Sequence, residues 1–229
     1  MGGTMNRREF VVSTVVGMVG LSHVSRVAGQ VKPVTPDLAA LADSKGLKLF
    51  NRVASRLSDG ARTGVRLSEA PGDGLAFLPG IDFANGTIEL DIRGKDVAQQ
   101  SFVGVAFHGI DGAAFDGVYF RPFNFRATDP VGHSHAVQYH SPPVYTWQKL
   151  RNEQPGKYEQ AVNPVPDPNA WFRARIVVTS AKVSVFVGQA KDPSLVVTLL
   201  NDRKQGLVGL WVGNNSGGDF ANLTITPAA

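Results

Sequence analysis

Acidic and basic side chains alternate with aliphatic ones in residues 86–93, which read GTIELDIR. Side chains alternate between the two faces of a strand, so Glu89, Asp91 and Arg93 share the face opposite the aliphatic residues. Charged groups are costly to bury unless they are paired. This face is therefore predicted either to line a polar groove or to be a solvated surface with an ion pair. In the first case Glu89 and Asp91 are candidate catalytic carboxylates, and Arg93 is a ligand-binding group that keeps Asp91 ionised.

A second candidate group combines His108, Tyr119 and Arg121 from two runs that are predicted to be neighbouring strands. His108 has the same parity as Gly104 and Ala106, whose small side chains leave room for a ligand above a sheet. Tyr119 offers an apolar platform for a sugar ring, and Arg121 supplies a fork of hydrogen-bond donors. The alternative is ordinary packing with an arginine–carboxylate pair.

The run HAVQYH places Gln138 and His140 on one face of a further predicted strand. Both are candidates for the polar lining of a groove, and His140 is a candidate general acid or base because its ordinary pKa is near neutrality. His133 and His135 just before it have a spacing that can hold a metal, with Asp129 or His140 as a third ligand. Nothing in the sequence fixes that third ligand, so no metal site is assigned here.

Two tryptophans and one polar turn complete the candidates. Trp211 lies between glycines in GLWVGNN and is either a stacking platform or a core residue. Trp147 is a candidate lid residue, and Asn215 a candidate ligand-binding residue. Asn214 and Asp219 in the same turn are oxygen ligands of the kind calcium takes, although a turn favours such residues anyway. Apart from calcium, no cofactor is expected.

The elements that must position these groups are short strands separated by turn-forming residues such as Pro71–Gly74 and Asn85-Gly86. No long helical periodicity or internal repeat occurs. This pattern predicts an all-β, two-sheet antiparallel jelly-roll sandwich over residues 47–226. The predicted strands are 47–57, 64–67, 75–77, 86–93, 101–108, 117–125, 135–140, 171–179, 182–187, 195–199, 207–212 and 220–225.

One long segment, residues 141–170, interrupts this rhythm with six prolines and several aromatic residues. Loops of this length within a compact domain are usually functional or disordered, and the aromatic residues argue against disorder. We therefore expect an ordered flap over one edge of the groove. Residues 30–46 are expected to be a linker with a short helix.

The first 29 residues have the pattern of an export leader. Arg7 and Arg8 are followed by the apolar run Val11–Leu21, which is too short to span a bilayer. The paired arginines resemble a twin-arginine signal, which predicts a periplasmic or secreted protein with no stable membrane insertion after cleavage. An ordinary secretory signal and an uncleaved anchor are the alternatives.

Composition excludes several classes of protein. The chain has no cysteine, so it has no disulfide, thiolate metal site or cysteine nucleophile. Its formal charge of +4 falls to about +2 without the leader, and no basic run points to nucleic acid. Phosphate loops, nucleophile elbows and dinucleotide fingerprints are also missing from the sequence.

The runs GTIELDIRG, SFVGVAFHG, YFRPFNF, HAVQYH, WFRARIVV, KVSVFVG and GLWVGNNSGGDFANLTI together resemble the concanavalin-A-like, or laminin-G-like, jelly roll. More narrowly, they resemble the bacterial exported domains called keto-disaccharide hydrolase-like. The resemblance covers residues 45–226 and rests on the order and spacing of the runs. It implies a secreted, glycan-related protein without settling catalysis.

Glu89 and Asp91 also match two positions of the strand motif of family-16 glycoside hydrolases, whose third carboxylate is replaced here by Gly94. Retaining hydrolysis needs two carboxyls that flank the bond, whereas residues two apart on one strand lie side by side. The expected function is thus an exported domain that binds a carbohydrate or sugar derivative on its concave face. The alternatives are a hydrolase or lyase acting on an oxidised disaccharide, and a cell-surface interaction domain without a sugar ligand.

Overall fold

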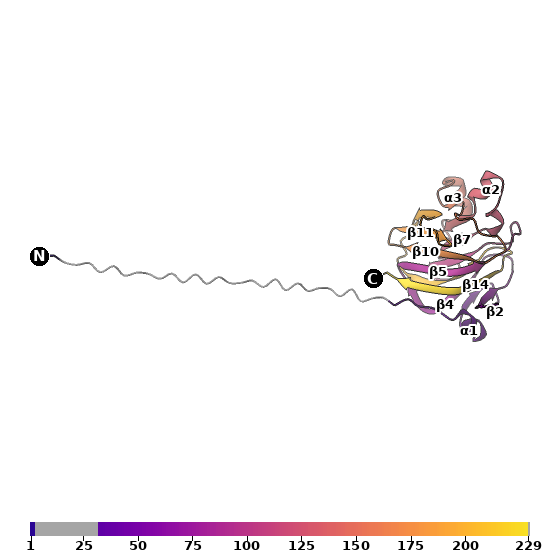
Figure 1. Cartoon of the computed structure of the whole chain (residues 1–229), viewed down its shortest axis with the longest axis horizontal. Coiled ribbons are helices and arrows are strands. Elements are labelled where there is room, and N and C mark those ends of the chain that lie inside the picture. The colour runs from indigo at the N-terminus through magenta and orange to yellow at the C-terminus, as the bar shows by residue number, and fades with distance from the viewer. Residues whose placement is uncertain (3–31, 229) are drawn as a thin grey trace.

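Two antiparallel sheets face each other in the computed structural model, which describes residues 1–2 and 32–228 (Figure 1). In spatial order, sheet I consists of β1 (Lys48–Phe50), β4 (Gly74–Phe83), β13 (Gly206–Val212), β6 (Val103–Gly109), β7 (Asp116–Phe120), β8 (Val137–His140) and β9 (Glu159–Gln160). Sheet II consists of β12 (Leu195–Thr198), β11 (Lys182–Val187), β10 (Phe172–Val178), β5 (Gly86–Arg93), β14 (Gly218–Pro227), β3 (Arg62–Leu67) and β2 (Ala54–Asp59). The predicted all-β sandwich is confirmed.

The main core lies between the sheets and follows the predicted alternation. Leu90 and Ile92 of β5 are fully buried in one cluster with Val105 and Phe107 of β6. A second, smaller cluster contains alternate residues of sheet I that point away from sheet II. Its members are Leu75, Phe77, Ala106, Phe115, Tyr119 and Trp211. Sheet I therefore carries apolar side chains on both faces. Phe50, Phe102 and Leu207 pack against those on its outer face.

Short helices lie at two ends of the sandwich (Figure 1). The helix α1 (Leu38–Asp43) is capped by the side chain of Asp37 and contacts β2 and β3. Its buried apolar residues tie part of the segment expected as a linker to the domain. At the other end, the 3-10 helix η1 (Pro122–Asn124), α2 (Pro130–Ser134) and α3 (Trp147–Glu153) follow β7 and β8.

Element boundaries differ from the predicted ones where the chain changes direction. The single strand expected over residues 47–57 is divided into β1 and β2, which belong to different sheets. Between them Asn51 has a φ of 50°, and the side chain of Arg52 is buried. The strand expected to reach residue 125 ends at Phe120, because Pro122 lacks a backbone donor and starts η1.

The predicted leader, residues 1–29, lies almost wholly outside the described residues. Among the residues described, no helix is both long and apolar enough to cross a membrane.

Candidate functional site

A cavity of about 280 Å³ lies on the outer face of sheet I, beside α3. Its aromatic lining consists of Phe102, Tyr119, Trp147 and Trp211. Its polar lining consists of Asp73, Gln99, Arg121, Asn124, His135, Arg151, Asn214 and Asn215. The cavity thus joins residues of the sheet to Trp147 and Arg151 of the segment 141–170.

The floor of the cavity is a cross-strand row of side chains. Trp211, Gly104, Tyr119 and Gln138 lie opposite one another on β13, β6, β7 and β8. The glycine in this row lets the two flanking rings approach to 4.7 Å between centroids. A Cβ on Gly104 would meet the backbone of Val118 and Tyr119 at 2.1–2.6 Å. The sheet therefore needs glycine at this position to form the aromatic floor.

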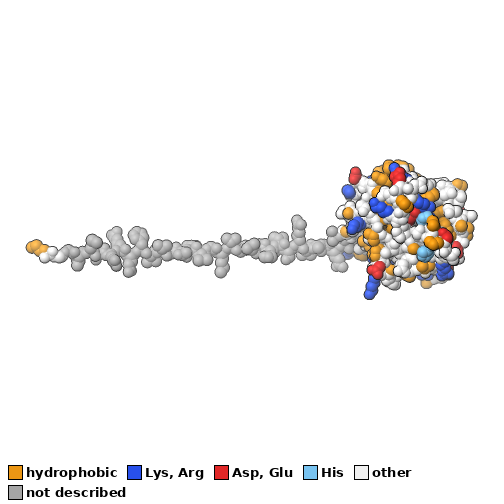
Figure 2. All heavy atoms as spheres, turned by 90° about the horizontal axis from the view of Figure 1, so that it is seen from above, with side chains coloured by type: hydrophobic (Ala, Val, Ile, Leu, Met, Phe, Trp, Pro, Cys, Tyr) orange, Lys and Arg blue, Asp and Glu red, His pale blue; other side chains and the backbone are white. Residues whose placement is uncertain are grey.

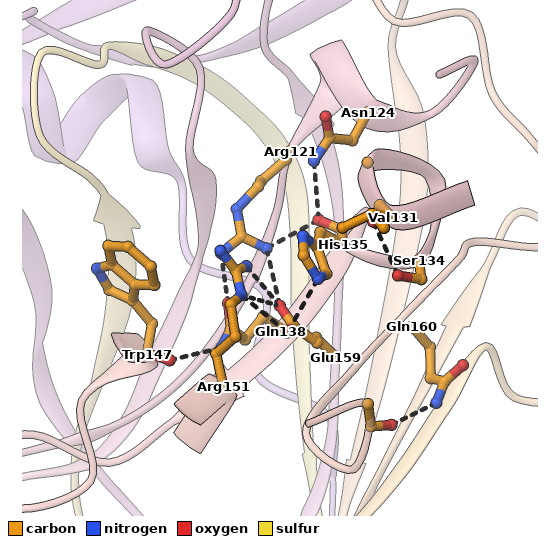
Figure 3. Close-up of polar contacts among 12 residues, drawn as sticks. Arg121, Asn124, Val131, Ser134, His135, Gln138, Trp147, Arg151, Glu159 and Gln160 are labelled. Atoms are coloured by element: carbon orange, nitrogen blue, oxygen red, sulfur yellow. Dashed lines mark hydrogen bonds and ion pairs between the residues drawn. The ribbon is translucent and has the colours of Figure 1, made fainter. Parts of the chain in front are cut away.

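Five polar residues converge beside this floor (Figure 3). Arg151 donates two nearly parallel bonds to Glu159, from Nε at 2.9 Å and from Nη2 at 2.6 Å. His135 Nε2 lies 3.2 Å from the same carboxylate, and Arg121 Nη1 lies 3.8 Å from it. Arg121 also donates to Gln138 Oε1, to the Tyr119 hydroxyl at 2.7 Å and to the carbonyl of His135 at 2.8 Å. The bidentate contact pairs the charges of Arg151 and Glu159, whereas the hydrogen bonds of Arg121 go to neutral acceptors.

The pKa values of the charged groups in this cluster shift in different directions. Burial lowers the pKa of Arg121, and the nearby Arg151 lowers it further against the opposing effects of Tyr119 and Glu159. Burial also lowers the pKa of His135, so its ring is neutral near pH 7. By contrast, the hydrogen bonds that Arg151 donates to Glu159 raise the pKa of Arg151. Arg121 is thus the cation in this cluster that lacks a carboxylate of its own.

Arg52 organises the opposite rim of the cavity. Its guanidinium donates to the carbonyls of Gly72 at 2.6 Å, Gly213 at 2.8 Å and Ser216 at 3.3 Å, which joins two loops. Asp73 in the first loop is exposed at the cavity, and burial by the surrounding protein raises the pKa of its carboxyl against the pull of Arg52. Because the side chain is exposed, we expect that rise to be small.

His140 lies in the cross-strand row next to the floor, opposite Gly117, and does not line the cavity. Its ring makes edge contacts with Tyr119 and Trp211 at centroid distances of 5.1 and 5.2 Å, and its Nε2 has no hydrogen-bond partner. Burial lowers its pKa to about 3, so the ring is neutral at pH 7. Trp211 Nε1 is likewise buried without a partner. These two nitrogens are buried polar atoms that the contacts among the described residues leave unsatisfied.

Glu89, Asp91 and Arg93 are not brought to the cavity. They lie on the outer face of sheet II, since the alternate residues of β5 form the core between the sheets. Arg93 does not pair with Asp91 as expected; it bonds to Asp59 and Asp219, both at 2.7 Å. Asp219 lies directly opposite Arg93 on the neighbouring strand, and directly opposed residues are closer than residues two apart on one strand.

Asp91 shows the same rule, because it faces Arg173 across the ladder and contacts it at 3.5 Å. It also accepts bonds from Arg62 at 3.1 Å and Asn222 at 2.7 Å. The expected common face for Glu89, Asp91 and His140 is therefore not present. Carboxylates on sheet II and a histidine on sheet I cannot act on one bond.

The side chain of His108 also lies on the opposite face of β6 from the one that alternation predicts. Its φ is 48°, next to an irregularity in the β13–β6 pairing, and this rotates the side chain onto Phe83 of the main core. The ring is buried between the Asp116 carboxylate at 3.1 Å and the carbonyl of Ala84 at 2.6 Å. Both ring nitrogens are thus occupied by buried contacts, and His108 does not reach the cavity.

The metal candidates do not form a cluster. No three His, Asp or Glu side chains in residues 32–228 are grouped so that they would hold a metal ion. Asp219 is bonded to Arg66 and Arg93 on sheet II, whereas Asn214 lines the cavity and accepts a bond from the backbone of Gly72 at 2.7 Å. Asp129 caps α2 through the Gly132 amide. Calcium binding stays a prediction.

Four residues that shape the cavity were not predicted as functional from the sequence, namely Arg52, Asp73, Arg151 and Glu159. Arg151 had a usable signal, because it follows Trp147 by four residues and so shares its face on a helix. The structure confirms that geometry, with the guanidinium 5.0 Å from the Trp147 ring centroid. The other three had no such signal, since their partners are distant in sequence.

Solved structures with a similar fold include a carbohydrate-binding module and a protein with a galectin-like fold. The carbohydrate-binding module CBM66 from Bacillus subtilis has 12% identity and a TM-score of 0.52, covering 78% of this chain and 98% of the module. The chain is a jelly-roll sandwich. A protein of unknown function with a galectin-like fold from Bacillus subtilis has 10% identity and a TM-score of 0.52, covering 86% of this chain and 96% of that one.

The exoplasmic/lumenal domain of VIP36, in its form bound to Ca²⁺ and Man3GlcNAc, has 7% identity and a TM-score of 0.50, covering 80% of this chain and 84% of that domain. No protein-family model matches the chain, and no curated protein matches it in sequence. Identities this low show a shared fold only. The predicted jelly-roll fold is confirmed, whereas the resemblance to keto-disaccharide hydrolase-like domains stays a prediction.

Proposed function

We propose that this chain is an exported carbohydrate-recognising domain that binds a glycan or sugar derivative in the cavity on the outer face of sheet I. The observation that carries the proposal is the aromatic floor of Trp211 and Tyr119 with Trp147 beside it and polar groups around it. Aromatic faces suit the apolar face of a sugar ring, and the fixed donors and acceptors suit its hydroxyls.

The neighbours in fold support the same class of ligand. CBM66 is described as a carbohydrate-binding module, and one VIP36 structure contains Man3GlcNAc. The export part of the proposal rests on the Arg7-Arg8 leader, which predicts twin-arginine transport to the periplasm or beyond. The ligand is placed on sheet I because its outer face carries aromatic side chains around a cavity, whereas the outer face of sheet II carries paired charges.

The test is a glycan array followed by titration calorimetry with the best ligand. Trp147 is 39% exposed, so Trp147→Ala should leave the fold intact and weaken binding by about tenfold or more, as expected for loss of a stacking residue. Trp171→Ala is the matched control, because Trp171 bonds to Asp59 on sheet II. Equal affinities for wild type and Trp147→Ala would overturn this location of the site.

The second candidate function is the hydrolase or lyase acting on an oxidised disaccharide that the narrower resemblance implies. One observation favours it, because Asp73 is an exposed carboxyl at the cavity and has no side-chain hydrogen bond among the described contacts. A carboxyl within reach of a bound substrate and without another side-chain partner can act as a general acid or base. Glu159, the nearby alternative, is held in a bidentate pair by Arg151.

Turnover of keto-disaccharides separates the two candidates. Asp73→Asn should abolish turnover while sugar binding persists if the domain is an enzyme that uses this carboxyl. A binding module should show no turnover in the wild type, and a blank result in both assays supports an interaction domain without a sugar ligand.

A further inference from the structure

We propose that the cavity selects an acidic sugar, one that carries a carboxylate or a sulfate ester, and that Arg121 and Arg151 bind the negative group. This inference rests on the proposed function, since it names the class of sugar that the same cavity takes. The aromatic floor receives the ring, and the two guanidiniums beside it receive the acid. Figure 3 shows both arginines directed toward the same small region, next to Trp147.

The positive and negative side chains around the cavity do not balance. Five charged side chains surround the cavity, of which Arg52 balances Asp73 and Arg151 balances Glu159. Arg121 has no carboxylate of its own and lies 3.8 Å from the one that Arg151 already occupies. The neutral ring of His135 adds no charge. One positive charge is therefore left over at a position where water is largely excluded.

The unbalanced guanidinium of Arg121 is also buried. Arg121 is 4% exposed, and a buried guanidinium without full compensation is costly. Its neighbours Tyr119 and Gln138 are neutral acceptors, which satisfy hydrogen bonds but not the charge. An anionic ligand would supply the missing charge in a low-dielectric setting, where the interaction is strong. A neutral sugar would leave the charge uncompensated.

Both arginines keep guanidinium donors that no described hydrogen bond uses. Arg151 uses Nε and Nη2 for Glu159, and no bond among the described contacts uses its Nη1. Arg121 uses Nη1 and Nη2, and no bond uses its Nε. Both residues line the cavity. Guanidinium donors on two arginines match the paired oxygens of a carboxylate or a sulfate.

The experiment titrates the full mature chain with matched trisaccharides of gluco and galacto configuration. Each set contains the uronic acid form, its carboxyl-reduced neutral form and a sulfated form of the neutral sugar. We expect at least one acidic member to bind about tenfold more tightly than its neutral counterpart, which corresponds to one charge-assisted hydrogen bond. The uronic acid and sulfate arms tell the two sources of charge apart. The preference should shrink at high salt.

Two variants with opposite expected effects keep the test independent of folding defects. Arg151→Gln leaves Glu159 to neutralise Arg121, so the preference for the acidic member should disappear. Glu159→Gln is close in shape and removes the competing carboxylate, so the preference should rise several-fold. Arg56→Gln is the control, because Arg56 forms a comparable pair with Asp43 at 2.7 Å in another part of the molecule.

The outcomes separate this inference from the proposed function. Neutral trisaccharides that bind as well as acidic ones, with Trp147→Ala still weakening them, would overturn the acidic-sugar inference and leave the sugar site standing. A preference unchanged in both Arg151→Gln and Glu159→Gln would overturn it as well. Failure of every sugar to bind would contradict the proposed function and, with it, the inference.

Discussion

Tyr119 links the floor of the cavity to the charged cluster beside it. Its ring contacts Trp211, while its hydroxyl accepts from Arg121 at 2.7 Å and donates to Gln138 at 2.8 Å. Burial raises the pKa of this phenol to about 12, so it stays protonated and can donate at any physiological pH. At the scale of single residues, the chemistry of the cavity thus depends on buried groups that satisfy one another.

Removal of that hydroxyl should be costly. Tyr119→Phe leaves Arg121 without one of its acceptors, and we expect the free energy of unfolding to fall by about 1–3 kcal/mol. Urea denaturation measures this loss. Tyr158→Phe is the control, because Tyr158 is buried and its hydroxyl makes no hydrogen bond among the described contacts. Equal losses in the two variants would contradict the described network.

His140 should make the protein sensitive to acid. Its pKa is about 3 in the folded protein and about 6.5 when unfolded, so only the unfolded chain binds a proton at pH values between these. Its contribution to stability is therefore present above pH 6.5 and is lost as the pH falls toward 3, at up to about 1.4 kcal/mol per pH unit.

The measurement is the free energy of unfolding at pH 7 and pH 5 for wild type and His140→Gln. The variant should lose less stability than wild type between the two values. His133→Gln serves as the control, since that side chain is partly exposed on α2. Parallel pH profiles for wild type and His140→Gln would show that His140 is not held neutral in the fold.

At the scale of elements, the cavity depends on how α3 is held. The helix is capped by Thr146 and anchored by Leu150, which is buried in the main core cluster, while Trp147 and Arg151 face the cavity. Leu150→Ala should cost about 2–5 kcal/mol locally. We expect faster amide exchange in residues 141–170 while the central strands of sheet I stay protected.

Lys149→Ala is the matched control, because this side chain is exposed on the same helix. If Leu150→Ala speeds exchange equally across both sheets, the flap is not a separate unit and the account of its anchoring is wrong.

The sequence predicted the elements better than the faces on which their residues lie. Alternation placed the aliphatic residues of β5 in the core and identified Tyr119, Gln138 and Trp211, which the structure brings into one row. It failed for His108, where a positive φ reverses the face. Alternation also cannot say which sheet a strand joins, so it grouped Glu89 and Asp91 with His140 although they belong to opposite sheets.

At the scale of the whole molecule, the two outer faces differ in kind. Sheet II carries arginines and aspartates in cross-strand pairs, such as Arg93 with Asp219. Sheet I carries an aromatic layer with a cavity. The face seen in Figure 2 carries both positive and negative side chains. The three tryptophans are divided between these two faces, because Trp147 and Trp211 line the cavity and Trp171 lies on sheet II.

The most direct test of a sugar site on sheet I is therefore the titration of the three indole N–H resonances with a bound oligosaccharide. The account predicts that the signals of Trp147 and Trp211 shift in a saturable way while that of Trp171 stays in place. A shift of the Trp171 signal alone, with the other two unmoved, would place the ligand on the opposite sheet and contradict the account.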